Sequence, residues 1–187
     1  MGKVRIGTVW LGGCSGCHMS FLDLDERLLE LAEVAEIMSS PITDWKLHTP
    51  VKEYQNYPEV DISLVEGAVV NTDNVEVLKI VRERSKIVVA FGDCAVTGNV
   101  PSYRNLFKVE DVLNAVYVEK STHGKQIPSD EVVIPKLLKK VVPISHVIKV
   151  DYYLPGCPPS ADSIWYTIKC LLEDKQPEFT KDHYRYG

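Results

Sequence analysis

The chain has 187 residues, 45% of them hydrophobic and 25% charged, a composition typical of a single water-soluble globular domain. The formal net charge is −5, which argues against a surface that binds nucleic acid or anionic lipid. No apolar run approaches the ~18 residues of a membrane-spanning helix, and no leader precedes the first predicted strand. We therefore expect one cytoplasmic domain over residues 1–187, with no nucleic-acid or membrane partner.

The predicted elements alternate between strands and helices along the chain. Apolar runs rich in β-branched residues predict four strands, at residues 4–11, 60–65, 86–91 and 146–154. Apolar residues at three- and four-residue spacing predict helices at residues 21–38, 73–84 and 161–172, with shorter ones at 109–116 and 134–140. Asp73 and Ser160 are the expected caps of the second and last long helices. The alternation predicts an α/β fold, flavodoxin-like and doubly wound, with a mainly parallel sheet and helices on both faces.

Four of the five cysteines follow the ends of predicted strands. Cys14, Cys94 and Cys157 each come three residues after a strand, and Cys17 shares the turn of Cys14. Glu66 directly follows the strand at residues 60–65. Because the carboxyl ends of parallel strands share one edge of a sheet, the fold is expected to bring these four thiols together, with Glu66 beside them.

Four thiolates favour zinc or an iron–sulfur cluster over harder ions. Structural zinc usually takes paired Cys-x-x-Cys knuckles from a small module, whereas this chain offers one pair and two single cysteines on separate loops. Glycines next to these cysteines leave room for a bulky group. We therefore favour one [4Fe–4S] cluster held by Cys14, Cys17, Cys94 and Cys157 over zinc, and FMN stays open because flavodoxin-like folds hold it at the same strand ends.

Other residues have weaker signals. Cys170 lies on the last predicted helix, opposite its apolar stripe, and is expected to be a bystander. His18 is a candidate for a cluster sulfur contact or proton movement, although an ordinary polar contact is the simpler expectation. Trp45, Tyr54 and Tyr57 are candidate partner contacts, with packing under the loop as the alternative. The chain shows no catalytic triad or phosphate loop, so it is expected to relay electrons rather than transform a substrate.

Four motifs carry a resemblance to a known family: Cys14-Ser15-Gly16-Cys17, Val65-Glu66-Gly67-Ala68, Gly92-Asp93-Cys94-Ala95 and Pro155-Gly156-Cys157-Pro158-Pro159. In this order they resemble the small subunit of [NiFe] hydrogenases over nearly the whole chain. The resemblance implies a [4Fe–4S] cluster on the four motif cysteines, proximal to a NiFe centre on a separate large subunit. It also implies that Glu66 and His18 lie in the cluster environment, near the subunit interface.

Within that family, the short single-cluster form resembles the small subunit of soluble NAD-reducing hydrogenases. Such a subunit is part of an H2:NAD+ oxidoreductase but does not catalyse the reaction alone. The implied partners are the NiFe-carrying large subunit and an iron–sulfur and flavin diaphorase. One competitor is the related cluster subunit of complex I, which carries two adjacent cysteines where Cys14 and Cys17 are separated. The other is a flavodoxin-like module that binds FMN or zinc.

Overall fold

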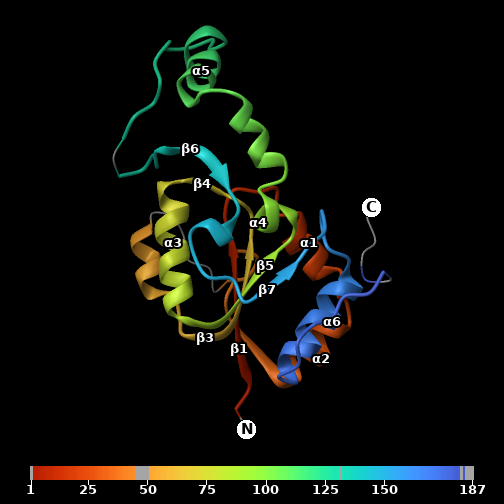
Figure 1. The fold of residues 1–187 in the computed structure, drawn as a ribbon. Helices are drawn as coiled ribbons and strands as arrows, with labels where there is room; N and C mark the ends of the chain where they lie inside the picture. The colour runs from red at the N-terminus through yellow and green to blue at the C-terminus, as the bar shows by residue number, and fades with distance from the viewer. Residues whose placement is uncertain (1, 45–50, 131, 182, 184–187) are drawn as a thin grey trace.

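A five-stranded parallel sheet in the order β2-β1-β3-β5-β7 forms the centre of the protein (Figure 1). The computed structural model describes residues 2–44, 51–130, 132–181 and 183. The strands of this sheet are β1 (Val4–Trp10), β2 (Ala35–Ser39), β3 (Val60–Glu66), β5 (Ser85–Phe91) and β7 (Tyr152–Leu154). This is the flavodoxin-like order, and it confirms the predicted α/β class.

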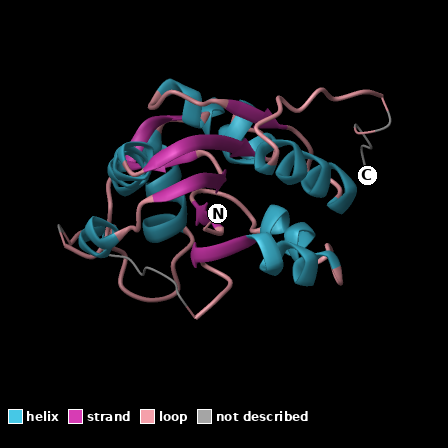
Figure 2. Ribbon diagram, turned by 90° about the horizontal axis from the view of Figure 1, so that it is seen from below, coloured by secondary structure: helices cyan, strands magenta, loops and turns pink. Residues whose placement is uncertain are grey.

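Helices cover both faces of the sheet (Figure 2). One face packs against α1 (Gly16–Leu22), α2 (Arg27–Val34) and α6 (Ala161–Leu172); the other packs against α3 (Thr72–Glu83) and α4 (Asp93–Thr97). In β5, Val89 and Phe91 belong to the first core, whereas Val88 and Ala90 belong to the second. Successive side chains of a strand point to opposite faces, so a strand buried on both sides reads as a continuous apolar run.

The predicted helix over residues 21–38 is wrong in its extent. The chain forms α1 and α2, separated by a turn in which Asp25 has φ 51°, and then continues as the edge strand β2. In β2 the side chain of Glu36 is exposed while Ala35 is buried. That alternation marks an edge strand, but the spacing of Leu31, Ala35 and Met38 also fits a helical stripe.

Two further predictions in the second half are corrected. Residues 134–140 were expected to be helical, but Leu137–Val142 form β6, which pairs antiparallel with β4 (Val69–Asn71). The strand predicted at 146–154 is too long: only the three residues of β7 are extended in the sheet. A short 3₁₀ turn, η4 (Ile144–His146), occupies the start of the predicted range.

The predicted helix caps are half right. Asn71, not Asp73, caps α3, with its side-chain oxygen accepting a hydrogen bond from the amide of Asn74 at 2.9 Å. Ser160 caps α6 as predicted, accepting from the amide of Ser163 at 3.3 Å.

The segment between α4 and β6 rises away from the central sheet (Figure 1). It contains the 3₁₀ helix η2 (Val100–Leu106), then α5 (Val109–Asn114) and a π-helical turn, η3 (Ala115–Glu119), which together confirm a predicted helix at 109–116. Another 3₁₀ helix, η1 (Val51–Asn56), precedes β3. Within the described ranges, no helix has the length and apolar character needed to cross a membrane.

Candidate functional site

The four motif cysteines lie on loops that leave one edge of the sheet. In the strand register, Trp10 of β1 pairs with Glu66 of β3, Glu66 with Phe91 of β5, and Phe91 with Leu154 of β7. Four strands therefore end in one row. Cys14 and Cys17 follow β1, Cys94 follows β5 and Cys157 follows β7, while Glu66 ends β3 in the middle of that row. Adjacent strands are about 4.8 Å apart, so β1 and β7 are separated by about 14 Å and the loops have to converge.

Hydrogen bonds tie these loops to one another across the row. On the β1 side, the amide of Leu11 donates to the Glu66 carbonyl at 2.8 Å, and Gly12 and Ala68 exchange two backbone bonds of 3.0 and 2.8 Å. The Ser20 hydroxyl of α1 donates to the Pro159 carbonyl at 2.5 Å. The loop after β1 is thereby fixed both to the adjacent strand and to the distant loop that carries Cys157.

The β5 and β7 loops are joined in the same way. The amide of Gly92 donates to the Leu154 carbonyl, and the amide of Asp93 donates to the Gly156 carbonyl, both at 2.8 Å. The Asp93 carboxylate accepts from the amide of Gly156 at 2.7 Å. The Asp93 side chain thus bonds the backbone of the neighbouring loop, and this bond holds the loops of Cys94 and Cys157 together.

Burial and negative neighbours act on the thiols. Cys17 is buried and Cys94 half-buried, whereas Cys14 and Cys157 are exposed. Burial, Glu66 and the other three cysteines all raise the pKa of the Cys17 thiol. Burial, then Cys157 and Cys14, raise the pKa of Cys94 to about 11. The Cys17 and Cys94 thiols therefore resist ionisation, and a bound metal cation would supply the positive charge that stabilises their thiolates.

The described side chains do not form a ready-made site for a single metal ion. Among the described residues, no three side chains of the His, Cys, Asp and Glu types gather closely enough to hold one metal ion. A tetrahedral zinc with Zn–S bonds of about 2.3 Å would need its four sulfurs about 3.8 Å apart.

Glycine is required where the loops approach most closely. Gly92 has φ +83°, and a Cβ at this position would lie 2.2 Å from the Sγ of Cys17. Gly156 has φ +138°, and its Cβ would lie 2.5 Å from the Cα of Pro159. Both positions exclude a side chain, which keeps the space between the cysteine loops open.

Glu66 and His18 form a buried polar pair beside this site. Each is 1% exposed. The Glu66 Oε2 accepts from the backbone amide of His18 at 2.9 Å and lies 2.5 Å from its Nδ1. The Nε2 of His18 lies 2.9 Å from the Thr8 hydroxyl, which donates to the Ser40 hydroxyl at 2.6 Å. The side chain of Ser15, the N-cap residue of α1, makes no capping hydrogen bond. The Glu66 carboxylate of β3 instead accepts from the His18 amide in the first turn of the helix.

This pairing refines the expectations for both residues. His18 makes the ordinary polar contacts that were the simpler prediction, since both ring nitrogens have partners in Glu66 and Thr8. Glu66 belongs to the surroundings of the cysteines, where it acts on the pKa of Cys17 and Cys94. At 1% exposure its side chain forms an internal link rather than a surface for direct contact with a partner.

Cys170 lies apart from the other four cysteines. It is half-buried on α6, in a hollow that it shares with Trp165, Glu173 and Lys175. The groups that raise the pKa of Cys17 and Cys94 include the other motif cysteines but not Cys170. The structure thus separates this thiol from the cysteine row.

The aromatic residues suggested as partner contacts are corrected in part. Tyr57 is fully buried, and its hydroxyl lies 2.8 Å from that of Ser63, so it belongs to the core. Tyr54 is half-buried and stacks on Tyr57 with ring centroids 6.2 Å apart. Packing under the loop therefore explains both tyrosines, and Trp45 falls outside the described residues.

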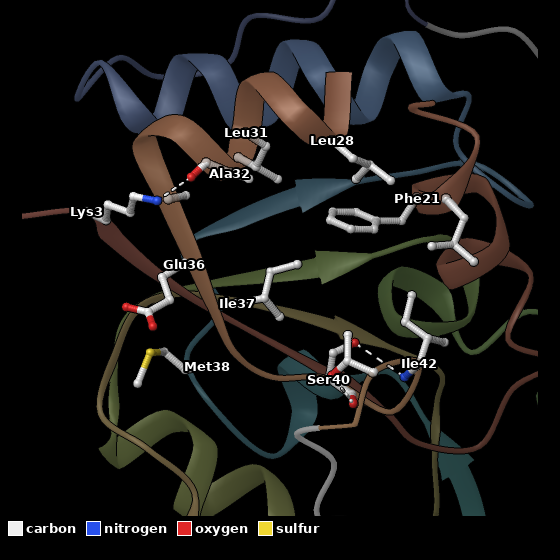
Figure 3. Close-up of a pocket in the computed structure, with 13 residues that line it drawn as sticks. Lys3, Phe21, Leu28, Leu31, Ala32, Glu36, Ile37, Met38, Ser40 and Ile42 are labelled. Atoms are coloured by element: carbon white, nitrogen blue, oxygen red, sulfur yellow. Dashed lines mark hydrogen bonds between the residues drawn. The ribbon is translucent and has the colours of Figure 1, made fainter. Parts of the chain in front are cut away.

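A separate pocket of about 600 Å³ lies between α1, α2 and β2 (Figure 3). Phe21, Leu31 and Ile37 give it a mainly apolar wall, while the amino group of Lys3 donates to the Ala32 carbonyl at its rim. No cysteine lines the pocket.

The strand order and the row of cysteines define a class of protein: a flavodoxin-like domain that presents four thiols where such folds bind their ligands. Residues 14–171 match the model of the family described as NADH ubiquinone oxidoreductase, 20 kDa subunit. The chain belongs to this family, which includes the small subunits of [NiFe] hydrogenases.

Similar proteins are hydrogenase subunits. The chain is 38% identical over 192 residues to the NAD-reducing hydrogenase HoxS subunit delta of Cupriavidus necator, with 99% of this chain and 86% of the relative covered. It is 39% identical over 180 residues to a subunit of the F420-non-reducing hydrogenase of Methanothermobacter marburgensis, covering 94% of this chain but 56% of the relative. The chain thus spans little more than half the length of that relative.

Solved structures agree with this assignment. A crystal structure of an NAD+-reducing [NiFe]-hydrogenase in the H2-reduced state contains a chain that is 44% identical, with a TM-score of 0.89 and 99% of both chains covered. A [NiFeSe]-hydrogenase of Dm. baculatum, 17% identical with a TM-score of 0.56, covers 98% of this chain and 69% of its own and shows a shared fold.

Proposed function

We propose that this chain is the electron-relay small subunit of an NAD-reducing [NiFe] hydrogenase, with one [4Fe–4S] cluster held by Cys14, Cys17, Cys94 and Cys157. The observation that carries the proposal is the convergence of these four cysteines at one sheet edge in a chain that matches an NAD+-reducing hydrogenase subunit over 99% of both lengths. A relative from Archaeoglobus profundus is named an iron–sulfur subunit, which supports the choice of cofactor.

The protein residues provide position and environment for this centre. A [4Fe–4S] cluster held by these four cysteines would supply one-electron redox chemistry. Cys17 is the buried ligand and Cys14 and Cys157 are the exposed ones, so the site is protected on the protein side and open on the outer side. Asp93 and Ser20 hold the three loops at fixed separations, and Glu66 with His18 anchors the start of α1.

The relay requires two partners. A subunit carrying the NiFe centre would cover the open side of the cysteine row, and an iron–sulfur and flavin diaphorase would exchange electrons with NAD. A complex I-like role is the main alternative because the matching family takes its description from that enzyme. Cys14 and Cys17 are separated by two residues, whereas the complex I subunit carries two adjacent cysteines. This difference favours a hydrogenase subunit over a complex I subunit.

Metal analysis tests the cofactor. Protein purified without oxygen should contain about four irons and four acid-labile sulfides per chain, following the cluster type. Stoichiometric zinc without sulfide would refute the cluster and support the zinc alternative.

Reconstitution tests the role. Hydrogen-dependent reduction of NAD, or of a dye, should appear only when this chain is combined with the large subunit and, for NAD, the diaphorase. The matched control is the Cys94→Ala variant with the same partners, which should lose the activity. Hydrogen-dependent dye reduction by the isolated, metal-verified chain would contradict the relay role.

A further inference from the structure

The 3₁₀ helix η2 turns apolar side chains toward the solvent and polar side chains toward the protein, the reverse of a typical surface helix. Three of its residues, Val100, Tyr103 and Leu106, are 60%, 68% and 75% exposed, and the following Phe107 is 63% exposed. In a 3₁₀ helix, side chains three residues apart lie directly above one another. The three side chains therefore form a straight row, continued by Phe107; we call these four residues the η2 ridge.

The polar residues of η2 face the protein and fix the ridge in place. The Arg104 guanidinium donates to the carbonyls of Leu138 and Val70, at 2.9 and 3.2 Å. The Asn105 amide exchanges two hydrogen bonds with the backbone of Val141, at 2.8 and 2.7 Å. Because these bonds join η2 to β6 and to β4, the ridge is held rigidly with its apolar side turned outward.

Such an arrangement is costly in an isolated chain and typical of an interface. Large exposed apolar groups in contiguous patches mark surfaces that another protein covers, and a rigid surface loses little conformational entropy on binding. Tyrosine is also enriched among the residues that dominate binding energy. The ridge therefore has the composition and rigidity of a docking surface.

The charge around the ridge indicates what covers it. Lys108 follows Phe107 directly, and the amino group of Lys140 donates to the Asn105 carbonyl at 2.6 Å. A symmetric dimer would place ridge against ridge and basic group against basic group. The complementary occupant is an apolar groove with an acidic rim on a different protein.

The position of the ridge identifies which partner this is. Helix α4 carries Cys94 and ends at Thr97, and η2 begins at Val100, so the ridge starts only a few residues after the helix that carries Cys94, where the chain rises from the sheet (Figure 1). We propose that the η2 ridge is the docking surface for the NiFe-carrying large subunit, which reaches it by extending from the open side of the cysteines. This inference rests on the proposed function, since that function requires the large subunit at this edge.

A matched pair of substitutions tests the proposal. Leu106→Glu places a charge in the ridge, and Leu29→Glu places the same charge at a 72% exposed leucine on α2, away from η2. Tyr103→Asp is a second ridge variant. Each full-length chain is purified without oxygen, checked for iron and sulfide, and titrated with the large subunit in a binding assay that also reports the diaphorase.

Both ridge variants should weaken binding of the large subunit by about thirtyfold or more, as expected for hot-spot residues. They should keep their iron, whereas Leu29→Glu should bind like the unchanged chain. Raising the salt concentration should weaken the unchanged complex, because the basic rim contributes to it.

Other results would overturn the ridge assignment. Wild-type affinity in both ridge variants would refute it while leaving the proposed function intact, because the unchanged chain would still form its complex. Loss of the diaphorase instead of the large subunit, or a chain that dimerises until Leu106→Glu makes it monomeric, would assign the ridge to a different occupant. Failure of the unchanged chain to bind the large subunit would refute both the ridge and the relay.

Discussion

The substitution Gly92→Ala tests how tightly the cysteine loops converge. Gly92 joins β5 to α4 with φ 83° and ψ 162°, a backbone region open essentially to glycine alone. An alanine Cβ would lie 2.2 Å from the Sγ of Cys17, whereas two non-bonded heavy atoms of this kind prefer at least about 3.5 Å. Relief of the clash requires the sulfur of Cys17 to move by about 1 Å or more.

The two effects of this change have different sizes. Backbone strain in this region costs about 1–3 kcal/mol, which is small against the 5–15 kcal/mol that stabilises a typical domain. For a chain of this length, 1 kcal/mol lowers Tm by about 2–4 °C. The variant should therefore fold, with Tm lowered by about 2–12 °C. Its displaced thiol should reduce the iron bound per chain to less than half.

Gly124→Ala is the control for backbone strain. Gly124 also has a positive φ, +49°, but nothing lies within 4 Å of the position of its Cβ. This variant should lose some stability and keep all its iron. Iron and sulfide analysis after anaerobic reconstitution, with thermal unfolding of the metal-free chains, measures both effects. Full iron content and an unchanged cluster spectrum in Gly92→Ala would refute the reasoning.

Three other predictions follow from the site. Cys170→Ala should leave iron content and redox spectra unchanged while Cys94→Ala abolishes the cluster, and equal iron loss in both would show that Cys170 takes part. Glu66→Gln should retain the cluster, because the side-chain oxygen of glutamine can still accept a hydrogen bond from His18, but it should impair assembly or turnover because the negative charge is gone. Loss of the cluster from a folded Glu66→Gln chain would make Glu66 part of the metal site. Because the pKa of Cys94 is raised from 9.0 to about 11, iron loading should improve as pH rises, and the metal-free chain should lose stability between pH 9 and 11, where unfolded thiols ionise first. Loading that is independent of pH, measured by iron titration, would contradict this last expectation.

The sequence reveals the strands that are buried on both faces and the cysteines that follow them. β3 alternates between apolar and polar residues, and β5 ends in a continuous apolar run, so the ends of both strands, and hence the positions of Glu66 and Cys94, are predictable to within a residue. The edge strand β2 was missed because its alternation coincides with a helical spacing that begins at Leu31. β6 was missed because Lys139 and Lys140 interrupt its apolar residues, and its pairing with β4 depends on residues far away in the sequence.

Contacts between distant side chains were beyond the reach of spacing arguments. The placement of Glu66 and His18 at one edge was predictable, but not that a single carboxylate oxygen would meet both the amide and the ring of His18. Tyr57 looked like an exposed aromatic because its neighbours are polar. It is buried with its hydroxyl paired to that of Ser63, which pairs in turn with the hydroxyl of Ser85 on the neighbouring strand.

The short strand β7 has a consequence for the order in which the protein matures. Only three residues of β7 pair with β5, at the border of the sheet, and the loop that follows carries Cys157. The position of Cys157 therefore depends on this short pairing, and the metal-free chain should fray first at β7. A group bound jointly by the cysteines that follow β1, β5 and β7 would fasten this border, so binding of that group and folding of the border would be coupled.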